Sequence, residues 1–265
     1  MAEIAVAATA PFGADVLERL AGRYDVAYLL TRPDRPRGRG RKLGPPPAKV
    51  VAERLGIPVR QPDRLDASLD LDVDTVVVAA YGLLIPGELL DRALWVNVHP
   101  SLLPRWRGAA PVERAIMAGD AKTGVTVHRT VRELDAGPWA AMEEFPIEPD
   151  DDAGAVFARA AELAPDLVHH ALSRQEFSPQ AEVGVTYAEK IGPADRELDW
   201  SRPAQELHDR IRALSPHIGA RSDLQGRSVT VWRSRIAPDG GLELLEVQPE
   251  GRRRMTYEEF LRGLR

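Results

Sequence analysis

The chain has 265 residues, with 35 basic and 40 acidic side chains, a formal net charge of −5 and no cysteine. Without cysteine, it has no disulfide scaffold, zinc–cysteine site or thiol nucleophile. The longest uncharged run, Thr75–Gly87, has 13 residues, too few to cross a bilayer as a helix, and no secretory signal is visible. Composition therefore predicts a globular cytoplasmic protein without membrane contact, and the acidic balance argues weakly against a nucleic-acid partner.

The first half of the chain alternates short apolar strands with amphipathic helices. The predicted strands are Ile4–Thr9, Val26–Leu30, Thr75–Ala80, Leu94–Val98 and Gly124–Thr130, and the predicted helices are Ala14–Ala21, Ala48–Leu55 and Pro111–Met117. This alternation favours an open, mostly parallel α/β sheet with helices on both faces. Such sheets bind their ligands beyond the carboxyl ends of the strands.

The second half predicts a helical region, a linker and a small β-rich domain. The expected elements are a helix over Asp151–Ser173 that Pro165 kinks or splits, a helix over Pro203–Leu214, strands Ser228–Ile236 and Leu242–Val247 joined by a turn, and a helix over Tyr257–Leu264. The predicted division of the chain is a first domain at 1–175, a polar linker at 176–195 and a second domain at 196–265.

A basic loop, Arg32–Lys42, interrupts the acidic chain. It carries six cations and one anion, a local charge of +5 within 11 residues. Its glycines and prolines predict irregular backbone. Clustered arginines neutralise nucleic-acid phosphates, and the loop follows the second strand at the edge where α/β sheets bind ligands. Composition leaves two interpretations open: a phosphate-contacting loop or an ordinary solvated one.

Asn97 and His99 form the strongest chemical motif. They lie two residues apart at the end of a predicted strand, so both side chains point to one face. An amide donor beside an imidazole suits stabilisation of an oxyanion and transfer of a proton. Asp135 lies on a turn after the strand Gly124–Thr130, and a parallel arrangement of neighbouring strands would bring it near His99. The alternative is a hydrogen-bonded strand-end histidine and a turn-forming aspartate.

Several segments resemble the methionyl-tRNA formyltransferases. The segments HPSLLPRWRGAAPVERAIMAGD, TGVTVH and LDAG are typical of the wider folate-dependent formyltransferases. The basic loop, VTYAEKI (Val185–Ile191), VTVWR (Val229–Arg233) and LLEVQPEGRRRM (Leu244–Met255) narrow the resemblance to the tRNA enzymes. It covers nearly the whole chain and implies a Rossmann-like formyltransferase fold followed by an OB-like β-barrel. That barrel is expected to be shortened, because only five residues separate Ile236 from Leu242.

The resemblance implies an enzyme of translation initiation, a monomer without a metal. It would transfer the formyl group of 10-formyltetrahydrofolate to the α-amino group of initiator methionyl-tRNA. Three groups of residues receive roles. The catalytic positions are Asn97, His99 and Asp135. The folate-binding positions are Ser101, Leu102, Leu103, Pro104, Ala80, Tyr81, Gly82 and Leu83. The tRNA-contacting positions are Arg35, Arg37, Arg39, Arg41 and Lys42.

The expected chemistry has Asn97 and a protonated His99 stabilising the oxyanion, with Asp135 keeping His99 charged or accepting the proton of the amine. His128 is expected to be a packing residue, and Trp106 either stacks on a ligand or anchors its loop. Two alternative functions stay open: a sugar-nucleotide N-formyltransferase using the same donor, and a catalytically degenerate tRNA-binding relative. A nicotinamide-dependent enzyme is disfavoured, because no GxGxxG follows the first strand.

Overall fold

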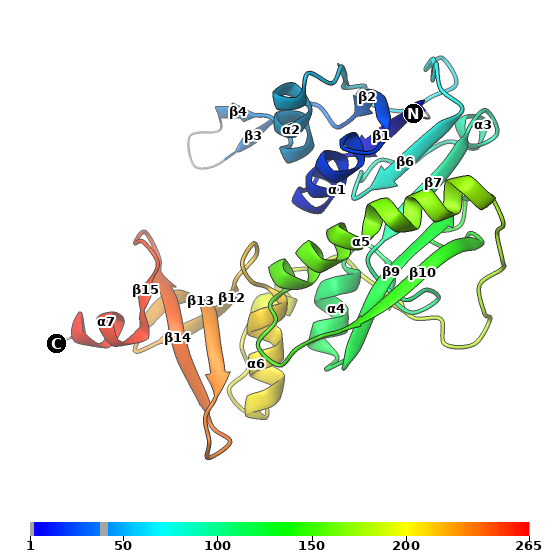
Figure 1. The fold of residues 1–265 in the computed structure, drawn as a ribbon. Helices are drawn as coiled ribbons and strands as arrows, with labels where there is room; N and C mark the ends of the chain where they lie inside the picture. The colour runs from blue at the N-terminus through cyan, green and yellow to red at the C-terminus, as the bar shows by residue number, and fades with distance from the viewer. Residues whose placement is uncertain (1–2, 38–41, 265) are drawn as a thin grey trace. The chain divides into compact units, whose positions relative to one another are not determined.

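The computed structural model describes residues 3–37 and 42–264. Its contacts divide the chain into two compact units, each assembled from several segments (Figure 1). The first unit comprises Met1–Arg107, Gly124–Glu144 and Ala158–Thr186, and the second comprises Gly108–Thr123, Phe145–Phe157 and Tyr187–Arg265. The predicted domain boundaries at 1–175, 176–195 and 196–265 stay a prediction. Among the described residues, no helix combines the length and apolar character needed to span a bilayer.

A seven-stranded sheet with the order β10-β9-β7-β6-β1-β2-β5 forms the core of the first unit. Its strands are β1 (Glu3–Ala8), β2 (Asp25–Leu30), β5 (Val59–Arg60), β6 (Thr75–Ala79), β7 (Leu94–His99), β9 (Lys122–Arg129) and β10 (Trp139–Pro146). The pairs β1–β2, β1–β6, β2–β5 and β6–β7 are parallel. The central strands β1 and β6 are almost entirely buried, as their apolar sequences predict. The predicted mostly parallel α/β sheet is therefore confirmed.

One pair of neighbouring strands in this sheet is antiparallel. β9 is antiparallel to β7, with His99 opposite Thr126 and Val96 opposite Arg129. The expectation of parallel strands here was wrong. β9 ends beside the first half of β7, so the turn that carries Asp135 has to return along the sheet to reach Asn97 and His99.

The helices of the first unit are α1 (Pro11–Ala21), α2 (Pro47–Leu55), α3 (Gly87–Leu90) and the larger part of α5 (Ala153–Arg174). Gly13 permits α1 to approach β6 closely, because a Cβ at this position would lie 2.3 Å from the carbonyl oxygen of Ala79. α5 contains Pro165 and yet is one helix of 22 residues. The predicted interruption at Pro165 does not split it.

The described part of the basic loop forms a short antiparallel ribbon, which corrects the prediction of irregular backbone. β3 (Arg35–Arg37) pairs with β4 (Lys42–Gly44). At its base, Asp34 accepts hydrogen bonds from Lys49 Nζ at 2.9 Å and from Gln61 Nε2 at 2.8 Å. The one acidic side chain of the loop is thus neutralised by a cation from α2.

The second unit is built on a four-stranded antiparallel sheet with the linear order β12-β13-β14-β15. Its strands are β12 (Ala220–Leu224), β13 (Arg227–Ile236), β14 (Leu242–Pro249) and β15 (Met255–Thr256), and its helical elements are α4 (Pro111–Met117), η1 (Ala194–Arg196), α6 (Ala204–Ala213) and α7 (Tyr257–Arg262). A separate two-stranded sheet pairs β8 (Arg107–Gly108) with β11 (Tyr187–Ala188).

The core of this unit includes Leu207, Ile211, Val231, Val247 and Phe260, which are all buried. The predicted β-rich C-terminal domain is confirmed. Its described strands form an open sheet with β12 and β15 at the edges rather than a closed barrel, because the short turn after Ile236 leads directly into β14.

Candidate active site

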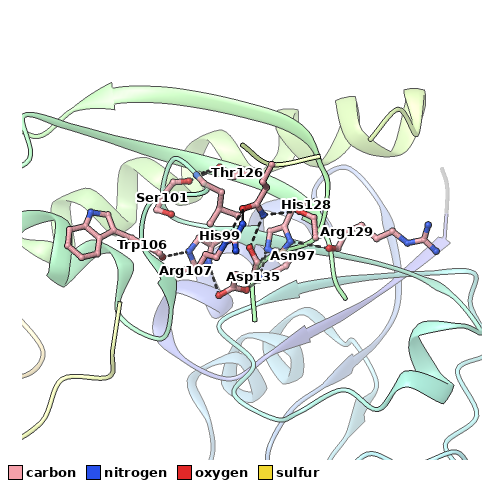
Figure 2. Close-up of polar contacts among 12 residues, drawn as sticks. Asn97, His99, Ser101, Trp106, Arg107, Thr126, His128, Arg129 and Asp135 are labelled. Carbon is pink, nitrogen blue, oxygen red and sulfur yellow. Dashed lines mark hydrogen bonds and ion pairs between the residues drawn. The ribbon is translucent and has the colours of Figure 1, made fainter. Parts of the chain in front are cut away.

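Polar side chains converge at the carboxyl end of β7. Figure 2 shows Asn97, His99, His128 and Asp135 turned toward one another. Asn97 and His99 come from one face of β7, His128 comes from β9, and Asp135 comes from the turn between β9 and β10. The structure thus brings together the three predicted catalytic residues and adds a fourth side chain.

His99 is held in one tautomer by the backbone. Its Nε2 lies 2.8 Å from the carbonyl oxygen of Trp106, and because a carbonyl only accepts, this nitrogen carries a proton. Its Nδ1 faces Asp135 Oδ2 at 3.7 Å. Burial lowers the pKa of His99, although the nearby Asp135 opposes this effect. The lowered pKa favours the neutral imidazole, whereas the expectation from the sequence was a His99 that Asp135 keeps charged.

Trp106 shapes this site through its main chain. The residue has φ of 63°, and its N–H donates to Thr186 Oγ1 at 2.8 Å. The guanidinium of Arg105 lies over its indole ring at 4.4 Å. The structure supports the anchoring interpretation of Trp106, since its carbonyl oxygen is the group that orients His99.

The Asn97 amide nitrogen has two acceptors. It lies 3.2 Å from Asp135 Oδ1 and 3.3 Å from His128 Nε2. His128 Nδ1 lies 3.1 Å from the carbonyl oxygen of Arg129, so the proton of a neutral His128 is on Nδ1 and Nε2 accepts. The expectation that His128 merely packs was incomplete. Its contact with Asn97 depends on the β7–β9 register, which the sequence did not reveal.

The Asp135 turn is built from unusual backbone. Asp135 has φ of 47°, a left-handed conformation that aspartate tolerates better than most residues. A Cβ at Gly137 would lie 1.8 Å from the carbonyl oxygen of Arg129, so only glycine fits. Gln180, which sequence reasoning missed, donates to the carbonyl oxygens of Asp135 at 2.7 Å and Gly137 at 2.8 Å. Its own Oε1 accepts from Arg107 Nη2 at 2.7 Å.

The predicted folate-binding segment Ser101–Pro104 directly follows His99. Ser101 is buried and its hydroxyl donates to the carbonyl oxygen of Arg105 at 2.7 Å. Thr126 fixes the segment from β9, since its hydroxyl donates to the Ser101 carbonyl at 2.7 Å and accepts from Leu103 N–H at 3.1 Å. Leu103 is buried, whereas Leu102 and Pro104 are partly exposed. The two partly exposed residues are the ones able to touch a ligand.

The second predicted folate-binding segment, Ala80–Leu83, follows β6. The carbonyl oxygen of Ala80 accepts from Thr9 N–H at 3.2 Å and ties this segment to the end of β1. Ala80 and Gly82 are exposed, while Leu83 packs against the core. Tyr81 is 2% exposed, and its hydroxyl has no hydrogen-bond partner among the described residues.

Burial raises the pKa of Tyr81, an effect that nearby Arg32 partly opposes. Arg32 Nε is also buried and without a hydrogen-bond partner in the described part of the chain. One of its terminal nitrogens lies 3.7 Å from the position of a Cβ on Gly82. Two unsatisfied polar groups, one after β2 and one after β6, fit a ligand with hydrogen-bonding ring atoms, such as the pterin of a folate.

Three of the predicted tRNA-contacting residues, Arg35, Arg37 and Lys42, lie on the basic ribbon. Arg35 is exposed at the start of β3. The backbones of Arg37 and Lys42 pair at the far end of the described ribbon, and Arg39 and Arg41 lie outside the described residues. Because β1, β2 and β6 are parallel, their carboxyl ends lie at the same edge of the sheet. The ribbon follows β2 at this edge.

One group within the described residues has spacing suited to a metal ion, namely His99, His128 and Asp135, with ligand atoms within 4.8 Å of one another. Nitrogen and carboxylate ligands of this kind suit zinc. In the structure, however, His128 Nε2 and Asp135 Oδ1 accept hydrogen bonds from Asn97. The arrangement is therefore consistent with a proton-transfer cluster.

This fold and this cluster are those of a group-transfer enzyme. Sequence comparison identifies the family of such enzymes to which the chain belongs. The profile described as "Formyl transferase" matches residues 3–172, and that of "Formyl transferase, C-terminal domain" matches residues 190–241. The chain belongs to the formyl transferase family.

The relatives of the chain agree with this assignment. The methionyl-tRNA formyltransferase of Paracoccus denitrificans is 40% identical, in a match that covers 97% of this chain and 95% of that protein. Among solved structures, methionyl-tRNA formyltransferase from Clostridium thermocellum has a TM-score of 0.69 at 15% identity, covering 94% of this chain and 99% of that one. HypX from Aquifex aeolicus in complex with tetrahydrofolic acid has a TM-score of 0.69 at 18% identity, covering 98% of this chain and 47% of that one.

Proposed function

We propose that this enzyme transfers the formyl group of 10-formyltetrahydrofolate to the α-amino group of initiator methionyl-tRNA. The observation that carries the proposal is the cluster of Asn97, His99 and Asp135 at the carboxyl end of β7. It occurs in a chain whose 40%-identical relative, matched over nearly its full length, is named methionyl-tRNA formyltransferase. The enzyme acts in the cytoplasm as a monomer, and its product starts translation.

The folate donor is held between the two predicted segments. Ala80–Leu83 contacts the pterin, and the unsatisfied Tyr81 hydroxyl and Arg32 Nε are available to its polar ring atoms. Leu102 and Pro104 provide partly exposed apolar surface beside His99. When bound, 10-formyltetrahydrofolate supplies an electrophilic formyl carbon.

The amine of methionyl-tRNA attacks that carbon. A peptide α-amino group has a pKa of about 7.7–8.0, and an adjacent ester lowers the value, so the neutral nucleophile is plentiful at pH 7. As the new C–N bond forms, the carbonyl oxygen gains negative charge and the Asn97 amide donates to it. The proton of the amine passes to the Asp135–His99 pair, whose facing atoms are 3.7 Å apart.

A neutral resting His99 suits this sequence of steps. Its Nδ1 has a lone pair and is able to receive the proton, while Nε2 stays bound to the Trp106 carbonyl. Once Asp135 shares a proton, it is a weaker acceptor for Asn97, so the amide hydrogen is released to the oxyanion. The same pair then returns a proton to N10 as the bond between N10 and the formyl carbon breaks.

The tRNA reaches this site past the basic ribbon. Arg35 and the neighbouring cations contact phosphates of the acceptor stem, which suits the local charge of +5. Asp34 does not oppose this attraction strongly, because Lys49 lies 2.9 Å from its carboxylate.

A direct acceptor assay tests the proposal. The protein is incubated with 10-formyltetrahydrofolate and either charged initiator tRNA, charged elongator methionyl-tRNA or an amino-sugar nucleotide, and the formylated product is identified. Formylation of initiator methionyl-tRNA, faster than of the elongator, is expected. Formylation of the amino sugar alone would assign the enzyme to the sugar-nucleotide class instead.

A further inference from the structure

His128 is a buried, titratable side chain in the site for which the chemistry above has no role. It is 1% exposed and lies directly opposite Asn97 in the β7–β9 register. Side chains that face each other across a strand pair share one face of the sheet and lie close together. The contact with Asn97 is therefore set by the backbone and does not require a special side-chain conformation.

The Arg129 carbonyl fixes the ring of His128. Because Nδ1 donates to this carbonyl at 3.1 Å, Nε2 of the neutral ring presents a lone pair to the Asn97 amide nitrogen at 3.3 Å. The second hydrogen of that nitrogen points to Asp135. An asparagine amide has nearly the same shape in both orientations, so these two acceptors decide that the nitrogen, and not the oxygen, faces the site.

We propose that His128 is a positioning residue for formyl transfer, whose Nε2 fixes the orientation of the Asn97 amide. The inference rests on the proposed function, because it assigns Asn97 as the donor to the oxyanion. Without an acceptor at this position, the Asn97 amide is able to turn around, and its oxygen would then take the place of the donor to the oxyanion.

His128 also contacts the other residues of the cluster. From β7 its neighbour is His99, with ring centroids 6.1 Å apart, and from the turn it is Asp135, with Oδ1 at 3.6 Å from Nε2. The charged side chains of β10, Glu143 and Glu144, are exposed to solvent. Figure 2 shows the side chain of Arg129 pointing away from the cluster.

Two substitutions separate positioning from packing. His128→Leu fills the space without an acceptor, and His128→Gln retains an acceptor oxygen. Loss of one buried acceptor is expected to lower kcat about tenfold in His128→Leu, with the KM values for tRNA and folate within about twofold of wild type. His128→Gln should retain most of kcat.

His208→Leu is the matched control, because His208 is also buried, at 5% exposure, but hydrogen-bonds to Ser234 and Pro149 in the second unit. It should change the unfolding midpoint without changing kcat. A normal kcat in His128→Leu, or equal losses of kcat in His128→Leu and His128→Gln, would overturn the proposal. All variants are assayed with whichever amine the wild type formylates. A wild type that does not formylate methionyl-tRNA would therefore contradict the proposed function without contradicting the role of His128.

Discussion

Asn97 and His99 show at the residue scale how one strand end supplies two different functions. The Asn97 amide is oriented by two side-chain acceptors, whereas His99 is oriented by a backbone carbonyl. Neither arrangement contributes to the apolar core. Both residues are therefore expected to be dispensable for folding and essential for chemistry.

Replacement of either residue by alanine tests this expectation. Asn97→Ala or His99→Ala should lower kcat by about 10²–10³-fold, the usual effect of losing one oxyanion donor or proton carrier. The unfolding transition should stay close to that of wild type. His170→Ala, at an exposed position of α5, is the control. Near-normal turnover in either site variant would remove these residues from the mechanism.

Gly137 tests the backbone that carries Asp135. In Gly137→Ala, the new Cβ would meet the Arg129 carbonyl at 1.8 Å, so the turn has to move. We expect a loss of about 1–3 kcal/mol in unfolding free energy together with a lower kcat, measured by denaturant unfolding and steady-state kinetics. Gly192→Ala, whose Cβ would have its nearest contact at 3.7 Å, should change neither. A fully active Gly137→Ala enzyme would mean that the turn does not position Asp135.

At the scale of elements, most of the secondary structure follows from local sequence. The helix at Pro111–Met117 has the predicted bounds, and the central strand at Thr75–Ala80 ends one residue earlier than predicted. The direction of β9 was not predictable from its sequence, because the residue pattern of a strand is the same whether it pairs parallel or antiparallel. The ribbon was not predicted, because the prolines and glycines of the loop indicate irregular backbone, whereas its two ends pair with each other.

The ribbon predicts a salt-dependent interaction with tRNA. Replacing Arg37, Arg39 and Arg41 together with alanine should raise the KM for tRNA and reduce the steepness of its dependence on salt, by about one unit for each phosphate that is no longer neutralised. The KM for folate should not change. A triple alanine variant of the exposed Arg54, Arg64 and Arg174 changes the net charge equally and is the control. An equal effect in both triple variants would show general charge attraction instead of contact by the ribbon.

α5 provides a stability prediction. Pro165 lies inside this 22-residue helix and has no N–H to donate to the preceding turn. Pro165→Ala restores that donor at a partly exposed position, and we expect the unfolding free energy to rise by about 1–3 kcal/mol. Thermal unfolding measures the change. A lower melting temperature would show that packing around the proline ring outweighs the missing hydrogen bond.

At the scale of the whole molecule, the pH dependence of stability has an identifiable contributor in Glu113. Burial raises its pKa above the ordinary value of 4.5, and its Oε2 has no hydrogen-bond partner among the described residues. The folded state therefore binds this proton more tightly than the unfolded state does. Its contribution to stability is fully present below pH 4.5 and is lost as the pH rises through the folded pKa.

Glu113→Gln removes this titration while keeping the size of the side chain. At pH 7 the variant should be more stable than wild type by about 1–2 kcal/mol, because it buries no charge, and the difference should vanish below pH 4.5. Denaturant unfolding at several pH values measures this. Glu162→Gln, at a side chain that is 61% exposed, should show no comparable pH dependence. A difference that is constant with pH would contradict the assignment.

The sequence by itself determined the α/β class, most element positions, the family and the candidate residues Asn97, His99 and Asp135. These follow from local periodicity and from motifs that are contiguous in the chain. It also showed that a net charge of −5 conceals a local charge of +5, so the total charge was a poor guide to the partner. Only the tertiary structure decided which nitrogen of His99 donates to the Trp106 carbonyl, the place of His128 and the route by which Asp135 reaches the site. Each of these depends on strand direction, register and burial, which arise from contacts between segments distant in the chain.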